Sequence, residues 1–198
     1  MNAHVPNRSE QRLRSVRTPD AVRTGGHVFV DESKQGDYLL IATRIAPAEV
    51  GRSRQTVRTL ILPGQSRLHM KPERPARKHL ILSTFERANL SATIFRAGAS
   101  YKTQIDARLA CLESLIRDAT EHSDARLCLE LDQTLVARDR RALTQLTKQY
   151  QCNDLEFRHE RAAQEPLLAV PDGIGWAWAR GGDFRRRAQP MVVDVIDV

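Results

Sequence analysis

The stretch 27-HVFVDESKQGDYLLIAT-43 contains two apolar runs on either side of a polar turn that includes Gly36. Both runs are rich in valine, leucine, isoleucine and aromatic residues, which is the composition of β-strands. A glycine-containing turn between two such runs is typical of a β-hairpin. We therefore expect the folded part of the chain to begin with two antiparallel strands, the first of which ends in Asp31 and Glu32.

Beyond this hairpin, apolar residues recur alternately with the spacing of helices and of strands. We expect helices over residues 47–61, 75–89, 102–122, 138–150 and within 165–179, and strands over 91–96, 125–132 and 154–159. Strands that are separated by helices pair in parallel through right-handed crossovers, whereas the opening hairpin must be antiparallel. The sequence therefore predicts an α/β, three-layer fold with a mixed five-stranded sheet flanked by helices.

The chain has 198 residues, of which 41% are hydrophobic and 28% charged, as expected of one globular domain with its own core. Residues 1–26 are polar and rich in arginine, and we expect them to form a flexible basic arm before a domain over residues 27–198. No apolar run approaches the roughly 20 residues of a membrane span, and the start of the chain lacks the apolar segment of a secretory signal. The three cysteines form no CxxC element, so we expect a reducing, cytoplasmic setting.

The formal net charge is +7, and five of the 31 basic residues are lysines, so arginine dominates. Arginine codons are rich in G and C, so genome composition is one explanation of this excess. The other is an anionic partner, because the guanidinium fork binds phosphate through two hydrogen bonds. Nucleic acid, either RNA or DNA, is the partner that we expect. A membrane partner is not expected, and self-association into a homo-oligomer is left open.

Acids follow two of the predicted strands at the point where each strand ends. Asp31 closes the first, and Glu130 and Asp132 close the fourth. If these strands are neighbours, the carboxylates meet at one edge of the sheet, where Mg²⁺ or Mn²⁺ would offset their repulsion. Two such ions about 4 Å apart can hold a phosphodiester and activate water. The alternative is that acids end strands because loops are polar.

A third acid, Asp172, lies in an otherwise apolar segment and is a further candidate ligand. Its other interpretation is a first-turn acid that stabilises the start of a helix. His69, between Leu68 and Met70, is either a packed or surface residue or a group that moves a proton or contacts phosphate.

Four segments together resemble an uncharacterised family known as domain of unknown function 3800. They are 28-VFVDES-33, 67-RLHMK-71, 127-LCLELD-132 and 165-EPLLAVPD-172. The resemblance extends over about residues 27–190 and implies an RNase H-like fold. The chain departs from the family pattern at Lys34 and Gln35, where glycine is common, and at Pro171, where alanine is usual.

The resemblance also implies a function, that of a metal-dependent nuclease which hydrolyses phosphodiester bonds of RNA or DNA with Mg²⁺ or Mn²⁺. The implied metal ligands are Asp31, Glu130 or Asp132, and Asp172, and the implied catalytic residues are these acids and His69. In the RNase H-like fold a further acidic residue comes from the helix after the third strand. Asp106 and Glu113 are the candidates for it in this sequence. The alternative function is a non-catalytic module that binds nucleic acid or protein with a degenerate RNase H-like fold.

Overall fold

The computed structural model describes residues 25–198. The prediction of a basic arm over residues 1–26 therefore lies almost entirely outside the described residues. Within residues 25–198, no helix combines the length and the apolar character that a membrane span requires.

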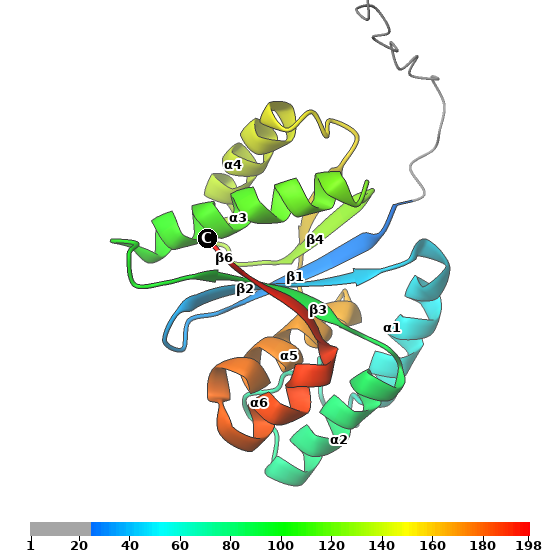
Figure 1. Cartoon of the computed structure of the whole chain (residues 1–198). Helices are drawn as coiled ribbons and strands as arrows, with labels where there is room; N and C mark the ends of the chain where they lie inside the picture. The colour runs from blue at the N-terminus through cyan, green and yellow to red at the C-terminus, as the bar shows by residue number, and fades with distance from the viewer. Residues whose placement is uncertain (1–24) are drawn as a thin grey trace, which may run out of the picture.

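A mixed six-stranded sheet in the order β5-β4-β1-β2-β3-β6 forms the middle layer of the molecule (Figure 1). Its strands are β1 (His27–Ser33), β2 (Tyr38–Ile45), β3 (Ala92–Ala97), β4 (Arg126–Glu130), β5 (Glu156–Glu160) and β6 (Val192–Asp197). β1, β2 and β3 pair antiparallel, and β4 and β5 continue the sheet parallel to β1. The opening hairpin and the parallel crossovers are thus confirmed.

The sixth strand is a difference from the five-stranded sheet that the sequence predicted. β6 pairs in parallel with β3 at the edge of the sheet. Its neighbouring residues Val195 and Ile196 pack against the two opposite cores. The pairing joins residues about 100 positions apart, so short-range periodicity does not reveal it.

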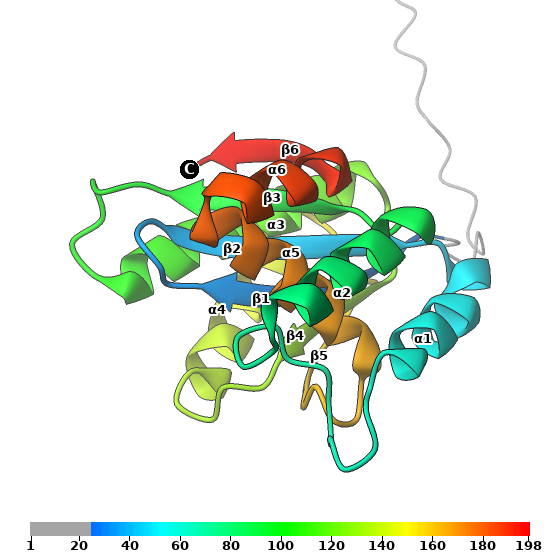
Figure 2. The same ribbon diagram turned by 90° about the horizontal axis from the view of Figure 1, so that it is seen from below.

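Helices cover both faces of the sheet, as predicted. They are α1 (Val50–Thr59), α2 (Pro75–Arg87), α3 (Gln104–Glu121), α4 (Val136–Gln149), α5 (Ala169–Arg180) and α6 (Gly182–Ala188). α3 and α4 cover one face, whereas α1, α2, α5 and α6 cover the other (Figures 1 and 2). The short α6 was not expected from the sequence.

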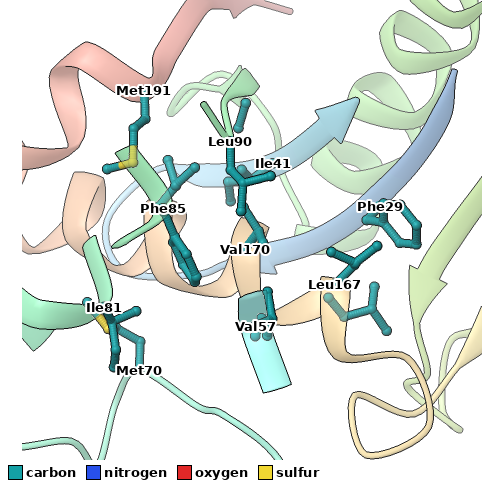
Figure 3. Close-up of a cluster of buried hydrophobic side chains, with 14 of the residues drawn as sticks. Phe29, Ile41, Val57, Met70, Ile81, Phe85, Leu90, Leu167, Val170 and Met191 are labelled. Carbon is teal, nitrogen blue, oxygen red and sulfur yellow. The ribbon is translucent and has the colours of Figure 1, made fainter. Parts of the chain in front are cut away.

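Two apolar cores fill the space between the sheet and these helical layers. On the α5 face, Phe29 and Ile41 of the sheet belong to the same core as Phe85 of α2 and Val170 of α5 (Figure 3). α5 lies close to the strands because Gly175 has no side chain: a Cβ there would lie 2.6 Å from Cδ1 of Ile41. This close packing holds the first turn of α5 near the ends of β1 and β4.

Candidate functional site

Asp31 and Glu130 lie side by side at the carboxyl ends of two neighbouring parallel strands. The register of β1 and β4 aligns Val30 with Leu129, so the next residue on each strand is one of these acids. Side chains alternate between the faces of a strand, and Phe29, two residues before Asp31, belongs to the core on the α5 side. Both carboxyl groups therefore lie on the face of the sheet that α5 covers.

Asp172, in the first turn of α5, is the third acid at this edge. Its Oδ2 accepts a hydrogen bond of 2.7 Å from the backbone N–H of Met70, and Nδ1 of His69 lies 3.3 Å from the same oxygen. His69 and Met70 belong to the long segment between α1 and α2, on the α5 side of the sheet (Figure 2). The structure thus brings the predicted Asp31, Glu130, Asp172 and His69 together.

Burial and neighbouring like charges together set the electrostatics of Asp31. The pKa of Asp31 is raised well above its ordinary value, first because its carboxyl is withdrawn from water, and then by the charges of Glu130 and Asp172. The carboxyl groups of Asp31 and Glu130 follow aligned residues of neighbouring strands on the same face of the sheet. The pair is therefore destabilised when both groups are ionised, unless a cation joins them.

Arg67 also belongs to this site, although the sequence did not single it out. Its Nη1 donates to Oε1 of Glu130 over 2.5 Å. The neighbouring His69 has a raised pKa, because its hydrogen bond with Asp172 raises the pKa more than burial lowers it. The available sequence signal for Arg67 was its place in the segment 67-RLHMK-71, two residues before His69.

Asp132 is at the mouth of the site rather than among the paired acids. Its Oδ1 accepts hydrogen bonds from the backbone N–H and the hydroxyl of Thr134, at 2.9 and 2.6 Å. These bonds lower the pKa of Asp132 and fix the turn before α4. A pocket of about 420 Å³ opens here, and Asp31, Glu130, Asp132 and Arg108 are among the residues that line it.

Arg108 of α3 reaches the pocket from the opposite face of the sheet and ties together a buried charged cluster. Its Nη1 donates to Glu32 and to the hydroxyl of Tyr38, while Nε and Nη2 donate to the two carboxylate oxygens of Asp139 at 2.8 and 2.7 Å. Nε2 of His159 lies 3.0 Å from Asp139. The cluster fixes Glu32, the immediate neighbour of Asp31, on the face opposite Asp31.

This cluster was not expected from the sequence, although a signal for it exists. Arg108 falls on the buried stripe of α3 together with Cys111 and Leu112, and Asp139 falls on the buried stripe of α4 together with Leu143. A charged residue in register with apolar neighbours is seldom buried without a charged partner. The pattern therefore indicated a buried pair, but not which residues form it.

The two candidates for a further acid from α3 have other partners. Asp106 lies at the start of α3, where its carboxylate accepts from the hydroxyl of Thr103 at 2.8 Å. Glu113 accepts from the hydroxyl of Tyr150 at 2.5 Å. The residue of α3 that lines the pocket is instead the cation Arg108.

The chemistry of the donor set suits Mg²⁺ or Mn²⁺, since three carboxyl groups offer hard oxygen ligands and the charges of Glu130 and Asp172 act unfavourably on ionised Asp31. Within residues 25–198, however, no group of three or more His, Cys, Asp or Glu side chains is already arranged to hold a metal ion. The carboxylates instead contact the segment between α1 and α2: Glu130 pairs with Arg67, and Asp172 with Met70 and His69.

Comparison with known proteins bears on the fold. No family model matches the chain, and no curated protein matches its sequence. Among solved structures, the chain is similar to RNase HII from Archaeoglobus fulgidus, which was determined as a complex with PCNA. The TM-score is 0.55 at 11% sequence identity, and the match covers 83% of this chain and 77% of that chain. This similarity, at the level of the fold alone, confirms the RNase H-like α/β architecture.

Proposed function

We propose that the protein is a metal-dependent nuclease that hydrolyses phosphodiester bonds in RNA or DNA. The convergence of Asp31 and Glu130 at the ends of neighbouring strands, in one pocket and with the charge of Asp172 acting on Asp31, is the observation that carries the proposal. A fold that holds ionisable carboxyls close together gives up stability at neutral pH, and a divalent cation would recover it. Membership of the family known as domain of unknown function 3800 is part of this proposal.

The proposed ligands of Mg²⁺ or Mn²⁺ are Asp31, Glu130 and Asp172. Asp132 is assigned to the turn before α4, because both of its hydrogen bonds go to Thr134. The bound cation would supply an activated water and would stabilise negative charge on the phosphate.

His69 has the properties of a proton carrier at this site. Its side chain is 37% exposed, and its hydrogen bond with Asp172 raises its pKa, so it holds a proton to higher pH than a free histidine. A protonated imidazole can donate to an oxygen that leaves phosphorus, or bind a phosphate oxygen. Asp172 orients the ring through Nδ1, which leaves Nε2 for the substrate.

A cleavage assay tests this function. Wild type, Asp31→Asn and Asp172→Asn are incubated with labelled single- and double-stranded RNA and DNA, with Mn²⁺ or with chelator, and Asp132→Asn serves as the matched control. We expect wild type and Asp132→Asn to cleave at least one substrate with Mn²⁺, and the other two variants to be inactive. Cleavage that survives Asp31→Asn, Asp172→Asn or the chelator would refute the proposed site.

The second candidate function is a non-catalytic module that binds nucleic acid. Two observations favour it: the carboxylates Glu130 and Asp172 already have partners in the chain, and α3 contributes the cation Arg108 to the pocket where a further acid was sought. Binding of labelled RNA or DNA by wild type, without cleavage of any substrate in Mn²⁺, would select this alternative.

A further inference from the structure

We infer that Arg67 is an internal counter-ion of the carboxylate site, which releases Glu130 to a divalent cation and then binds a phosphate of the nucleic acid. The inference deepens the proposed function and rests on it, since it assumes that the carboxylates bind a cation. It assigns a role to a residue that is neither a ligand nor one of the candidate catalytic groups.

The Arg67 side chain lies against the acids of the site. Its guanidinium is 2.5 Å from Glu130, which lies beside Asp31 at the end of the neighbouring strand. Arg67 therefore supplies positive charge to the group of acids in the absence of a metal. A divalent cation at these carboxylates would compete with Arg67 for the same oxygen and would repel its charge.

The segment that carries Arg67 is anchored in the core and to α5. Leu68 and Met70 are 3% and 1% exposed, respectively, and both belong to the core on the α5 side. The backbone N–H of Met70 is bonded to Asp172. The side chain of Arg67 is 38% exposed, so it can turn towards solvent while its neighbours stay in place. The backbone need not move for Glu130 to be released.

Once it is released from Glu130, the Arg67 side chain can bind phosphate. Glu130 is engaged through one nitrogen of Arg67, Nη1. A free guanidinium at the mouth of a cation site has several N–H groups for the oxygens of a phosphate, which it binds through two hydrogen bonds more readily than lysine does. The substrate phosphate must approach the same carboxylates, so it comes within reach of Arg67.

The experiment compares wild type with Arg67→Ala and Arg67→Lys, and uses Arg117→Ala as the charge-matched control. Arg117 is exposed on α3, on the other side of the sheet. Calorimetric titration with Mn²⁺ measures cation affinity, which does not depend on cleavage. We expect Arg67→Ala to bind Mn²⁺ about two- to fivefold more tightly than wild type. This is the change in affinity that corresponds to removing a competing, partly exposed ion pair. We expect Arg67→Lys to fall between Arg67→Ala and wild type, and Arg117→Ala to match wild type.

A second measurement tests whether Arg67, once released from Glu130, binds a phosphate of the nucleic acid. Fluorescence anisotropy of a labelled oligonucleotide is followed with Ca²⁺, a hard cation that takes the same oxygen ligands, and with chelator. Arg67→Ala should weaken binding with Ca²⁺ and leave binding in chelator unchanged. A residue with a purely structural role would not strengthen cation binding and weaken nucleic-acid binding at once.

Each contrary outcome points to a different error. Equal Mn²⁺ affinity of wild type and Arg67→Ala would overturn the counter-ion role while leaving the proposed nuclease intact. An equal loss of oligonucleotide affinity with Ca²⁺ and with chelator would mean that Arg67 contacts nucleic acid whether or not a cation is bound. That result would overturn the proposed exchange of Arg67 from Glu130 to phosphate. Absence of Mn²⁺ binding in both proteins would overturn the inference together with the cation site. Intact Mn²⁺ binding without cleavage would count against the nuclease function alone.

Discussion

Replacing Arg108 by methionine removes the cation that joins Glu32 to Asp139 inside the protein. Arg108 is 5% exposed and Asp139 is 1% exposed. Glu32 keeps a hydrogen bond from Tyr38 at 2.7 Å and an ion pair with Lys34 at 2.5 Å, so the loss of Arg108 affects Glu32 little. Asp139 keeps His159 at 3.0 Å but loses both hydrogen bonds of the guanidinium. The cost of Arg108→Met therefore falls mainly on Asp139.

Removal of one partner of a buried ion pair typically costs about 3–5 kcal/mol, because the other charge stays buried. We expect Arg108→Met to lower the free energy of unfolding by about that amount. For a chain of this size, each kcal/mol corresponds to about 2–4 °C, so the melting temperature should fall by about 6–20 °C. Urea unfolding, followed by circular dichroism, measures the free energy directly.

The double variant Arg108→Met/Asp139→Leu provides the matched control. It removes the stranded carboxylate as well, so it should be more stable than Arg108→Met alone. The folded-state pKa of Asp139 is lowered in wild type: burial raises it, but hydrogen bonds from Arg108 and His159 outweigh burial. The stability that Asp139 contributes is therefore present above its ordinary pKa and is lost as the pH falls through the lowered folded value. Without Arg108 the effect of burial on the Asp139 pKa is no longer outweighed, so the stability deficit of Arg108→Met should shrink as the pH falls towards the ordinary pKa of aspartate.

Two results would refute this reasoning. One is a loss below about 1 kcal/mol for Arg108→Met, which would mean that the buried pair contributes no more than a surface pair does. The other is a double variant whose loss equals the sum of the two single losses, because residues in direct contact should not be additive.

Three further predictions follow from the site and its setting. In chelator at pH 7, Asp31→Asn should raise the melting temperature, because a carboxyl with a raised folded pKa destabilises the fold until the pH falls through that pKa; a lower melting temperature would contradict this. Binding of labelled nucleic acid should weaken steeply between about 50 and 200 mM salt, and a flat profile would exclude multiple phosphate contacts. Gly175→Ala should lower the unfolding free energy by about 1–3 kcal/mol in urea, since its Cβ would lie 2.6 Å from Ile41; Gly51→Ala, with no atom within 4 Å, should not.

Much of the architecture could be predicted because it depends on short-range patterns. The hairpin of β1 and β2 and the alternation of later helices and strands follow from apolar spacing along the chain. The meeting of Asp31, Glu130 and Asp172 could also be predicted, since the carboxyl ends of neighbouring parallel strands and the start of α5 lie at one edge of the sheet.

The rest depends on contacts between distant parts of the chain. β6 pairs with β3 across about 100 residues, and nothing in its short apolar run specifies that edge. Arg67 reaches Glu130 from a long segment without regular structure, whose path is set by the burial of Leu68 and Met70. The choice between Glu130 and Asp132 depended on where β4 ends, because the chain turns after Glu130 and commits Asp132 to Thr134.

The central claim, that the acids at the ends of β1, β4 and α5 form a site for a divalent cation, is tested most directly by calorimetric titration with Mn²⁺. The comparison is between wild type, Asp31→Asn and Asp132→Asn, each checked for folding by circular dichroism. If Asp31 is a ligand and Asp132 is not, wild type and Asp132→Asn bind Mn²⁺ and Asp31→Asn does not. Equal binding by wild type and Asp31→Asn, or loss of binding in Asp132→Asn alone, would contradict it.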